Sequence, residues 1–418
     1  MSLPKIVVPP PGPRSRELAA RLAALESPAF DARRVARTAS SGEDQAPIVY
    51  ASGDGANVVD VDGNTYVDLT AGFGALLLGH RAPPASDLVL ALGDVYASEA
   101  KAEALAEIAS LFPEPGARVM LGLSGADAVT AALKTALLFT GKPGVVAFDG
   151  SYHGLSYGPL AALGFAPSFR EPFAAQLGVP VTFVPYGDVA AVRSALGPTI
   201  GAILVEPILG RGGCIVPPDD FLPGLRALAD ETGVLLVVDE IWTGLGRTGA
   251  MLASPVLPDV LCLGKGLGGG VPISACIGRA HVMQAWGGHG GTRIHTGTHF
   301  GSPPACAAAI ATIRAVRDQE LAARAGEVGA AFLAELRAAG IAARGRGLMV
   351  GIDLGDGARA LAIARRLLGE GYIVLTGGPA GGTLTLSPPL TIAPELLSAF
   401  TSVLAAITSP GSTKHRSH

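Results

Sequence analysis

The chain has 418 residues, of which 49% are hydrophobic, 16% are charged and only 5% are aromatic. This length and composition predict an ordered α/β protein of two domains with close helix–sheet packing, and they exclude a disordered chain. The formal net charge is -4 and no basic block is present, so we expect no nucleic-acid partner.

The sequence also argues against membrane insertion and export. The mean hydropathy is +0.42, but no run of about 18 residues lacks both charged and turn-forming residues, so we expect no membrane partner. We expect no signal peptide, because no long apolar stretch precedes a small-residue cleavage site. The four cysteines, at positions 214, 262, 276 and 306, form no C-x-x-C pair. Such scattered cysteines are typical of buried free thiols in a reducing cytosol, so we expect a cytoplasmic protein.

The N-terminal part of the chain predicts an arm, a helix and a hairpin. Residues 1–13 are rich in proline, and residues 15–26 place Leu18, Leu22 and Leu25 on one helical face. Two alternating runs flank Asp62-Gly63, a dipeptide typical of a hairpin turn. We expect residues 1–65 to join the smaller domain.

From about residue 70, helical and β-rich stretches alternate. This alternation predicts a mostly parallel sheet covered by helices, within a large cofactor-binding domain of residues 66–315. The expected helices are 100–112, 126–140 and 221–232, and the expected strands are 145–148, 181–184, 203–205, 235–238 and 260–263. Alanine-rich helices and three β-rich runs then predict a smaller α+β domain of residues 316–418.

Two segments, LLVVDEIWTGLGRTG and LCLGKGLGGGVPIS, bring reactive residues to the ends of predicted strands. Asp239 ends one strand, and Lys265 lies in a glycine-rich turn after the other. Ligands of open α/β sheets bind outside the carboxyl ends of the strands, and a carboxylate buried there needs a cation. Taken singly, Asp239 could cap the next segment and Lys265 could be a surface lysine. The order G-x-x-x-x-G-K-[ST] is absent, which excludes a phosphate loop of that type.

Taken together, the acid and the lysine match the needs of pyridoxal phosphate. The lysine forms an imine with the cofactor aldehyde, and the acid keeps the pyridine nitrogen protonated. Both segments resemble the class III aminotransferases, the family of ornithine, 4-aminobutyrate and many ω-amino acid transaminases. The likeness spans residues 47 to about 405. It implies the type I fold of pyridoxal-phosphate enzymes, with Lys265 as the Schiff-base lysine and Asp239 as the pyridinium partner. It also implies ping-pong transfer of an amino group from an amine or ω-amino acid to a keto acid.

The resemblance implies several further cofactor contacts. In LSGADAVTAALK, the backbone N–H groups of Ser124, Gly125 and Ala126 would bind the cofactor phosphate at a helix N-terminus; an ordinary N-cap gives the same pattern.

FDGSYHG, VEP and the residues after Asp239 would surround the cofactor ring. FDGSYHG places Tyr152 to stack on the pyridine ring, with His153 beside it, and Ile241 would pack on the other face. Glu206, in VEP, would lie near the imine side. Tyr152 could instead be a core residue, and Glu206 a surface carboxylate.

HTGTHFGSPPACAAA resembles a family segment that reaches the neighbouring subunit. By that match Thr298 would bind the phosphate of the partner's cofactor, which implies a homodimer with shared active sites. His295 and His299 are four residues apart, but without a carboxylate or third ligand nearby they predict no metal site.

Several departures from the family concern substrate choice. Many members have an arginine before the PPL segment, where this chain has Thr385, and a glutamate after VEP, where it has Arg211. The arginine that follows YHG in 4-aminobutyrate transaminases is replaced by Leu155. We hypothesise that Arg211 binds a substrate carboxylate as a bidentate pair; otherwise it faces solvent or pairs with an acid outside the site. Trp242 stands where many relatives have glutamine, and its indole N–H could donate in its place.

Two alternatives remain open from the sequence. Some racemases, epimerases and aminomutases share this fold, the lysine and the aspartate, and an isomerase needs no keto acid, which would suit the missing arginine at position 385. A non-catalytic binding protein on the same fold would be expected to lack Lys265 or Asp239, and this chain has both.

Overall fold

A seven-stranded sheet forms the core of the larger body in the computed structural model, which describes residues 1–81, 89–93, 95–288 and 292–409. Its strand order is β4-β10-β9-β8-β7-β5-β6. Neighbouring strands from β9 to β6 run parallel, whereas β10 is antiparallel to both β4 and β9. The predicted α/β fold with a mostly parallel sheet is therefore confirmed. The strands are β4 (Arg118–Gly122), β5 (Gly144–Phe148), β6 (Val181–Val184), β7 (Ile200–Val205), β8 (Leu235–Asp239), β9 (Val260–Leu263) and β10 (Ser274–Gly278).

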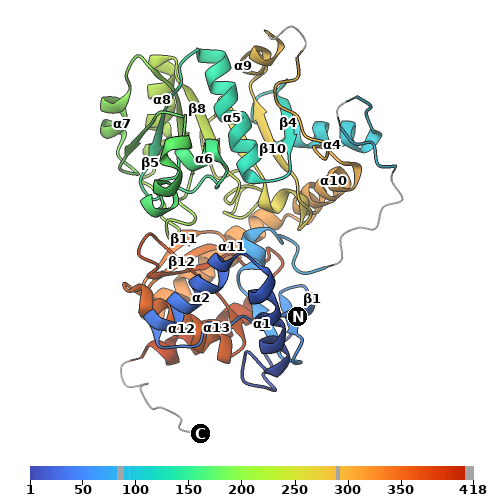
Figure 1. Ribbon diagram of the computed structural model, residues 1–418, viewed down its shortest axis with the longest axis vertical. Helices are drawn as coiled ribbons and strands as arrows, with labels where there is room; N and C mark the ends of the chain where they lie inside the picture. Colours follow the sequence, from blue (N-terminus) through green and yellow to red (C-terminus); the bar gives the residue numbers. More distant parts are fainter. Residues whose placement is uncertain (82–88, 94, 289–291, 410–418) are drawn as a thin grey trace.

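Helices surround this sheet, as Figure 1 shows. Every residue of β5, β7, β8 and β9 is buried, as expected for strands covered on both faces. Gly141 and Gly233 end α5 and α8 in the left-handed conformation, which glycine adopts readily. The helices are α3 (Ala71–Gly74), α4 (Glu99–Ala109), α5 (Gly125–Thr140), α6 (Tyr157–Ala161), α7 (Val189–Ala195), α8 (Phe221–Thr232), α9 (Ala280–Met283) and α10 (Pro303–Asp318).

The smaller body combines the two ends of the chain. One of its sheets has the order β1-β2-β3-β13 and the other β11-β12-β15-β14. Figure 1 shows the N-terminal helices α1 and α2 beside α12 and α13, and α2 packs directly against α12. The strands are β1 (Tyr50–Asp54), β2 (Asn57–Asp60), β3 (Thr65–Asp68), β11 (Ala343–Arg346), β12 (Met349–Asp353), β13 (Tyr372–Ile373), β14 (Leu375–Gly377) and β15 (Thr383–Leu386). The helices are α1 (Pro13–Leu25), α2 (Pro28–Ser41), α11 (Leu321–Ala338), α12 (Gly357–Gly369) and α13 (Pro394–Thr408).

Several local predictions can be compared with these elements. The helix predicted at 221–232 and the strands predicted at 181–184 and 260–263 agree with α8, β6 and β9. The hairpin at Asp62-Gly63 is confirmed by antiparallel β2 and β3 and a φ of 86° at Gly63. The helix predicted at 15–26 agrees with α1, but its leucine face is not the face that packs on the protein, because α1 buries Ser15 and Ala19 while Leu22 and Leu25 are exposed. The domain boundaries predicted after residues 65 and 315 stay predictions.

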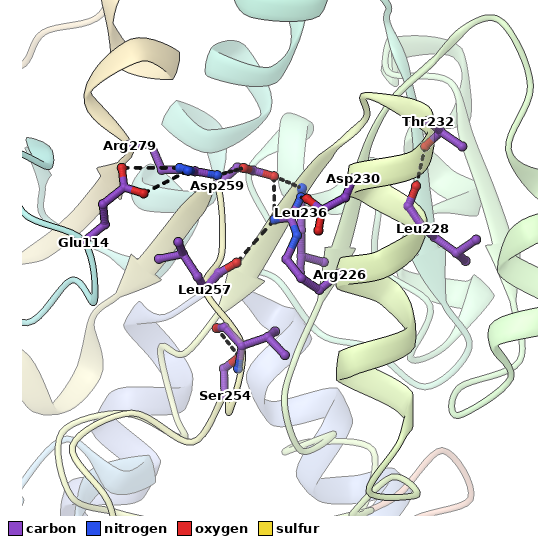
Figure 2. A network of polar contacts seen from close by, with 11 residues as sticks. Glu114, Arg226, Leu228, Asp230, Thr232, Leu236, Ser254, Leu257, Asp259 and Arg279 are labelled. Atoms are coloured by element: carbon purple, nitrogen blue, oxygen red, sulfur yellow. Dashed lines mark hydrogen bonds and ion pairs between the residues drawn. The ribbon is translucent and has the colours of Figure 1, made fainter.

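An ionic network ties together the amino ends of β8 and β9 (Figure 2). Asp259, buried directly before β9, accepts hydrogen bonds from Nη1 of Arg226 at 2.9 Å and from the backbone N–H of Leu236 at 2.8 Å. Its other oxygen lies 3.4 Å from Nη1 of Arg279. Each arginine also pairs with a second acid, at 2.8 Å in both cases: Arg226 with Asp230, and Arg279 with Glu114. The network joins α8, the amino ends of β8 and β9, and the residue after β10 around one buried carboxylate.

Within the described ranges, no helix has both the length and the apolar character that crossing a membrane requires. All four cysteines are buried and free.

Candidate active site

The two strand ends singled out by the sequence are neighbours in the sheet. Asp239, the last residue of β8, is paired in register with Cys262 of β9. Lys265 begins a 3-10 turn just after β9, at the same carboxyl edge of the sheet. Its φ of 42° is left-handed, which is unusual for a residue other than glycine. Such backbone strain is concentrated at functional sites, because the surrounding structure must hold it in place.

A cavity of ≈ 580 Å³ opens onto Lys265. Its wall on one side comes from the large sheet and on the other from α2, the segment that follows it, β14 and β15. The lining residues are Phe30, Arg33, Arg34, Arg37, Gln45, Pro47, Phe73, Tyr152, Glu206, Arg211, Trp242, Lys265, Leu375, Thr376, Gly377 and Thr385.

Asp239 is buried, and both of its carboxylate oxygens have hydrogen-bond partners. It is 4% exposed, and its Oδ2 lies 2.7 Å from Nδ1 of His153. Its Oδ1 accepts a hydrogen bond from the backbone N–H of Ile241 at 3.0 Å. Nε2 of His153 is buried and has no hydrogen-bond partner among the described residues. The aspartate therefore has a fixed orientation, as a residue that must hold a proton on a pyridine nitrogen requires.

Glu206 is a second buried acid close to the lysine. Its two oxygens accept hydrogen bonds from the backbone N–H groups of Tyr152, at 2.8 Å, and Gly210, at 3.1 Å. Burial raises the pKa of Glu206 to about 7; the charge of Asp239 acts in the same direction and that of His153 opposes it. A carboxyl group with this pKa can gain or lose a proton near neutral pH, a property often found at catalytic sites.

The amine of Lys265 lies against an indole ring. Its Nζ is 4.9 Å from the centre of the Trp242 ring. Burial lowers the pKa of Lys265, and the charge of Arg211 lowers it further, whereas Asp239 and Glu206 act in the opposite direction. A lower pKa increases the fraction of neutral amine, which is the form that attacks a carbonyl carbon. The charges of both acids thus act on the amine of Lys265.

The N-terminus of α5, where a phosphate contact was predicted, begins with a capping box. Oγ of Ser124 accepts from the backbone N–H of Asp127 at 3.2 Å, and Oδ2 of Asp127 accepts from the N–H of Ser124 at 2.9 Å. This capping box leaves the N–H groups of Gly125 and Ala126 without acceptors inside the helix. The serine is exposed, so the first turn is open to a phosphate group.

Small residues bring the surrounding segments close to this helix end. A Cβ on Gly125 would lie 2.7 Å from Cδ1 of Ile241, and one on Gly154 would lie 2.7 Å from Cβ of Ala126. The loop that carries Tyr152 and the residues after Asp239 therefore pack on the start of α5. Replacing either glycine would push these segments apart.

Trp242 forms a wall of the cavity. A Cβ on Gly74 would lie 2.5 Å from its Nε1, and one on Gly210 would lie 2.4 Å from its Cε3. The indole N–H is buried and finds no acceptor among the residues described. The ring fits only because both neighbours are glycines.

Arg211 extends into the same cavity. Its guanidinium carbon lies 4.8 Å from the centre of the Tyr152 ring and 5.2 Å from that of Phe165. No ion pair involves Arg211 within the described part of the chain. Burial lowers the pKa of Arg211; the nearby Tyr152 opposes this shift and Arg33 adds to it. The structure thus places the arginine beside Tyr152, in a cavity that also contains Lys265.

Two of the predicted residues lie elsewhere. Leu155 is 48% exposed and does not line the cavity. Thr298 is exposed in the segment before α10, where its carbonyl oxygen accepts from the N–H of Gly93 at 2.7 Å. Neither residue contacts the lysine site within this chain.

The sequence reasoning missed Arg33 and Arg37, which reach the cavity from α2. The helix itself had clear signals: Ser27-Pro28 at its start and Gly42, with a φ of 71°, at its end. Arginines four residues apart share one face of a helix. This pattern, once recognised, would have shown a basic face.

A lysine in a cavity, a fixed acid at the adjacent strand end, an open helix N-terminus and an aromatic ring together fit pyridoxal phosphate. These features define an enzyme that uses this cofactor. When bound, the cofactor supplies an electron sink for the substrate carbon that carries the amine. The chain belongs to the class III aminotransferase family, whose model, Aminotransferase class-III, matches residues 38–408.

Similar proteins agree with this membership. The chain is 41% identical to the acetylornithine aminotransferase of Methanopyrus kandleri over 75% of this chain and 82% of the relative. It is also 41% identical to that of Mycobacterium tuberculosis, over 86% and 92% of the two chains. The solved ornithine aminotransferase of Toxoplasma gondii, which holds pyridoxal phosphate at partial occupancy, superposes with a TM-score of 0.78 at 32% identity, over 86% and 90%. The protein is thus a pyridoxal-phosphate-dependent transaminase acting on small amines and keto acids.

Proposed function

We propose that this transaminase takes its amino group from an ω-amine that carries a carboxylate at the far end of the molecule, and passes it to a keto acid. The observation that carries this proposal is Arg211, which lines the same cavity as Lys265 without a carboxylate partner in the described structure. An arginine in a half-buried site is matched best by a substrate carboxylate, through paired N–H···O bonds. Acetylornithine, the substrate named for several relatives, has this arrangement of free amine and carboxylate.

In this proposal each residue at the floor of the site has one task. Lys265 would hold the cofactor, and its amine would remove and return a proton at the reacting carbon. Asp239, oriented by His153, keeps a proton on the ring nitrogen. Glu206 would lie on the lysine side of the ring.

Other residues hold the cofactor in place. The N-terminal turn of α5, at Ser124, Gly125 and Ala126, binds the phosphate group. Tyr152 and Ile241 would enclose the two faces of the ring. These contacts fix the orientation of the reacting carbon relative to the lysine amine, which is a large part of what a protein contributes to such chemistry.

A panel of amines, including acetylornithine, tested against pyruvate and 2-oxoglutarate, examines the proposal. We expect amino transfer from carboxylate-bearing ω-amines, and an Arg211→Gln variant should raise their KM by about ten-fold or more, because a charged hydrogen-bonded pair is lost. A matched amine without a carboxylate should be unaffected. Rearrangement or racemisation of the substrate without any keto acid would instead indicate an isomerase.

We also propose a homodimer with shared active sites. Thr298 supports it, because this residue is exposed and outside its own chain's cavity, as a residue serving a partner's cofactor would be. Light scattering should give twice the mass of one chain. Lys265→Ala protein can be mixed with Thr298→Val protein, which lacks the proposed phosphate contact, under conditions that exchange subunits. Each mixed dimer would then have one site with both residues intact, so part of the activity should return. No recovery would argue against shared sites.

The four free, buried thiols support a cytoplasmic location. Fractionation of the source cells, with antibodies to the protein, would test it.

A further inference from the structure

A second basic group lies on the α2 side of the cavity. Arg33 and Arg37, one turn apart on α2, line the cavity that also contains Arg211. Arg33 is exposed and Arg37 is half-buried. No ion pair involves either residue in the part of the chain that the structure describes. By contrast, Arg34 on the same helix lies 3.5 Å from Glu26. The cavity therefore contains arginines that the protein itself does not neutralise.

The position of Arg37 is fixed by a strand far away in the sequence. Its Nη2 donates a hydrogen bond to Oγ1 of Thr376 at 2.7 Å. Thr376 belongs to β14, which pairs with β15 so that Leu375 lies opposite Thr385. Position 385 is where many class III relatives have an arginine. Arg37 and Thr385 line the same cavity, so the guanidinium of Arg37 enters, from another element, the cavity that position 385 also faces.

Charge in this region is unbalanced. Burial lowers the pKa of Arg37, and the like charges of Arg33 and Arg211 lower it further. Glu206, an acid that lines the cavity, accepts hydrogen bonds from the backbone N–H groups of Tyr152 and Gly210. Partly buried cations without counterions are unfavourable. A ligand with more than one negative charge would relieve this repulsion.

We propose that Arg37 is a specificity-determining residue that binds the second carboxylate of a dicarboxylic keto acid, the amino acceptor. Arg211 binds one carboxylate, and Arg37 binds the other, toward α2. Arg37 thus takes over the task of the arginine missing at position 385. This inference rests on the proposed transfer to a keto acid, with Arg211 as the first carboxylate site.

Steady-state kinetics of the holoenzyme test the assignment with two acceptors of equal length. These are 2-oxoglutarate, with two carboxylates, and 2-oxopentanoate, with one. In an Arg37→Gln variant we expect KM for 2-oxoglutarate to rise about ten-fold or more, with kcat within about two-fold and KM for 2-oxopentanoate unchanged. Arg37→Lys should recover part of the loss, because it keeps the charge but not the planar fork. Thr376→Val, which removes the positioning hydroxyl, should give an intermediate rise.

An Arg16→Gln variant is the matched control. Arg16 lies on the neighbouring helix α1, pairs with Asp44 at 2.8 Å and does not line this cavity. The Arg16→Gln variant removes one positive charge from the same side of the molecule. An unchanged KM for 2-oxoglutarate in this variant would show that the effect of Arg37→Gln comes from a local contact and not from the change in net charge. An equal rise in KM for both acceptors in the Arg37→Gln variant would overturn the proposal.

A binding measurement separates this inference from the proposed function. Calorimetry of the holoenzyme with glutarate and with pentanoate, neither of which can react, should show tighter binding of glutarate that is lost in Arg37→Gln. Equal affinities for the two acids in the unaltered protein would overturn the assignment of Arg37. If glutarate binding depends on Arg37 but no keto acid accepts an amino group, Arg37 is supported as a carboxylate site and the proposed transfer fails.

Discussion

Charged side chains are paired at the amino ends of β8 and β9, whereas cations near their carboxyl ends are unpaired among the described residues. At the amino ends, Asp259 has partners for both oxygens, and the two arginines that reach it each have another acid (Figure 2). At the carboxyl ends, Lys265, Arg211 and Arg37 line a cavity without ion-pair partners in the described structure. The same pair of strands is thus anchored by matched charges at one end and prepared for ligands by unmatched charges at the other.

The difference shows which charges hold the fold and which await a substrate. A buried ionic group that is paired becomes costly when its partner is removed. A buried cation that has no partner in the protein is unfavourable until a ligand supplies one. Substitutions at the two ends should therefore change stability and activity in opposite patterns.

The largest expected effect is the loss of activity in Lys265→Ala. Removing the amine should lower the rate of amino transfer by at least about a thousand-fold, because in the proposed site this amine both bonds to the cofactor and moves the proton. Stability of the cofactor-free protein should be unchanged or slightly higher, since a buried cation is removed. Stopped-flow rates and thermal unfolding would measure both. Retained amino transfer would contradict the assignment of the site.

At the other end, Asp259→Ala should mainly reduce stability. We expect the free energy of unfolding to fall by about 3 kcal/mol, because two partly buried arginines lose their shared partner. Activity per folded molecule should change little, as the network lies at the opposite edge of the sheet. Urea denaturation with parallel activity assays would test this. A loss of activity in fully folded protein would show that the two ends are coupled.

Glu206 should make the stability of the cofactor-free protein depend on pH. Its pKa is raised from 4.5 to about 7, so between these values the folded state keeps a proton that the unfolded state has released. Raising the pH then favours unfolding. From about pH 5 to about pH 8, Glu206→Gln should gain about 2 kcal/mol in unfolding free energy relative to the unaltered protein.

Glu231→Gln is a suitable control for this pH effect. Glu231 is exposed, and the guanidinium of Arg193, 2.7 Å away, lowers its pKa. Its replacement should therefore cause no relative gain as the pH rises. The same slope in both variants would show that Glu206 is not the group responsible.

The smallest expected effect is a gain of stability in Arg211→Met. Methionine keeps an apolar stem against Tyr152 and Phe165 but removes the charge. We expect an unchanged or higher unfolding free energy, by up to about 1 kcal/mol, together with weaker binding of carboxylate substrates. Thermal unfolding in the absence of carboxylate ligands measures the first effect. A clear loss of stability would mean that the stacked guanidinium holds the cavity together.

Much of the sheet could be predicted because its central strands are buried on both faces. Their continuous apolar runs end abruptly at Asp239 and at the turn before Lys265, and this pattern is visible without any long-range information. β4 and β10 were missed, since RVMLG and SACIG carry charged or small residues that weaken the strand signal. The leucines of α1 were misjudged because periodicity alone does not say which face meets the rest of the protein.

The arginines of α2 show where prediction from the sequence ends. Arg37 and Thr376 are 339 residues apart in the sequence, so their contact depends on how α2 packs against α12. Arg211 could be singled out because it lies within a motif, but its neighbours in the cavity could not be inferred from the sequence. Contacts within one strand–turn segment can be inferred from the order of residues along the chain. Contacts between segments from opposite ends of the chain cannot.

α2 carries a consequence for how such enzymes diverge. Most of this helix, including Arg33 and Arg37, precedes residue 38, where the match to the family model begins. Under the role proposed for Arg37, substitutions on this helix would alter the choice of acceptor while the catalytic strands are preserved. Exchanging this one helix between two homologues would be an economical way to transplant substrate preference.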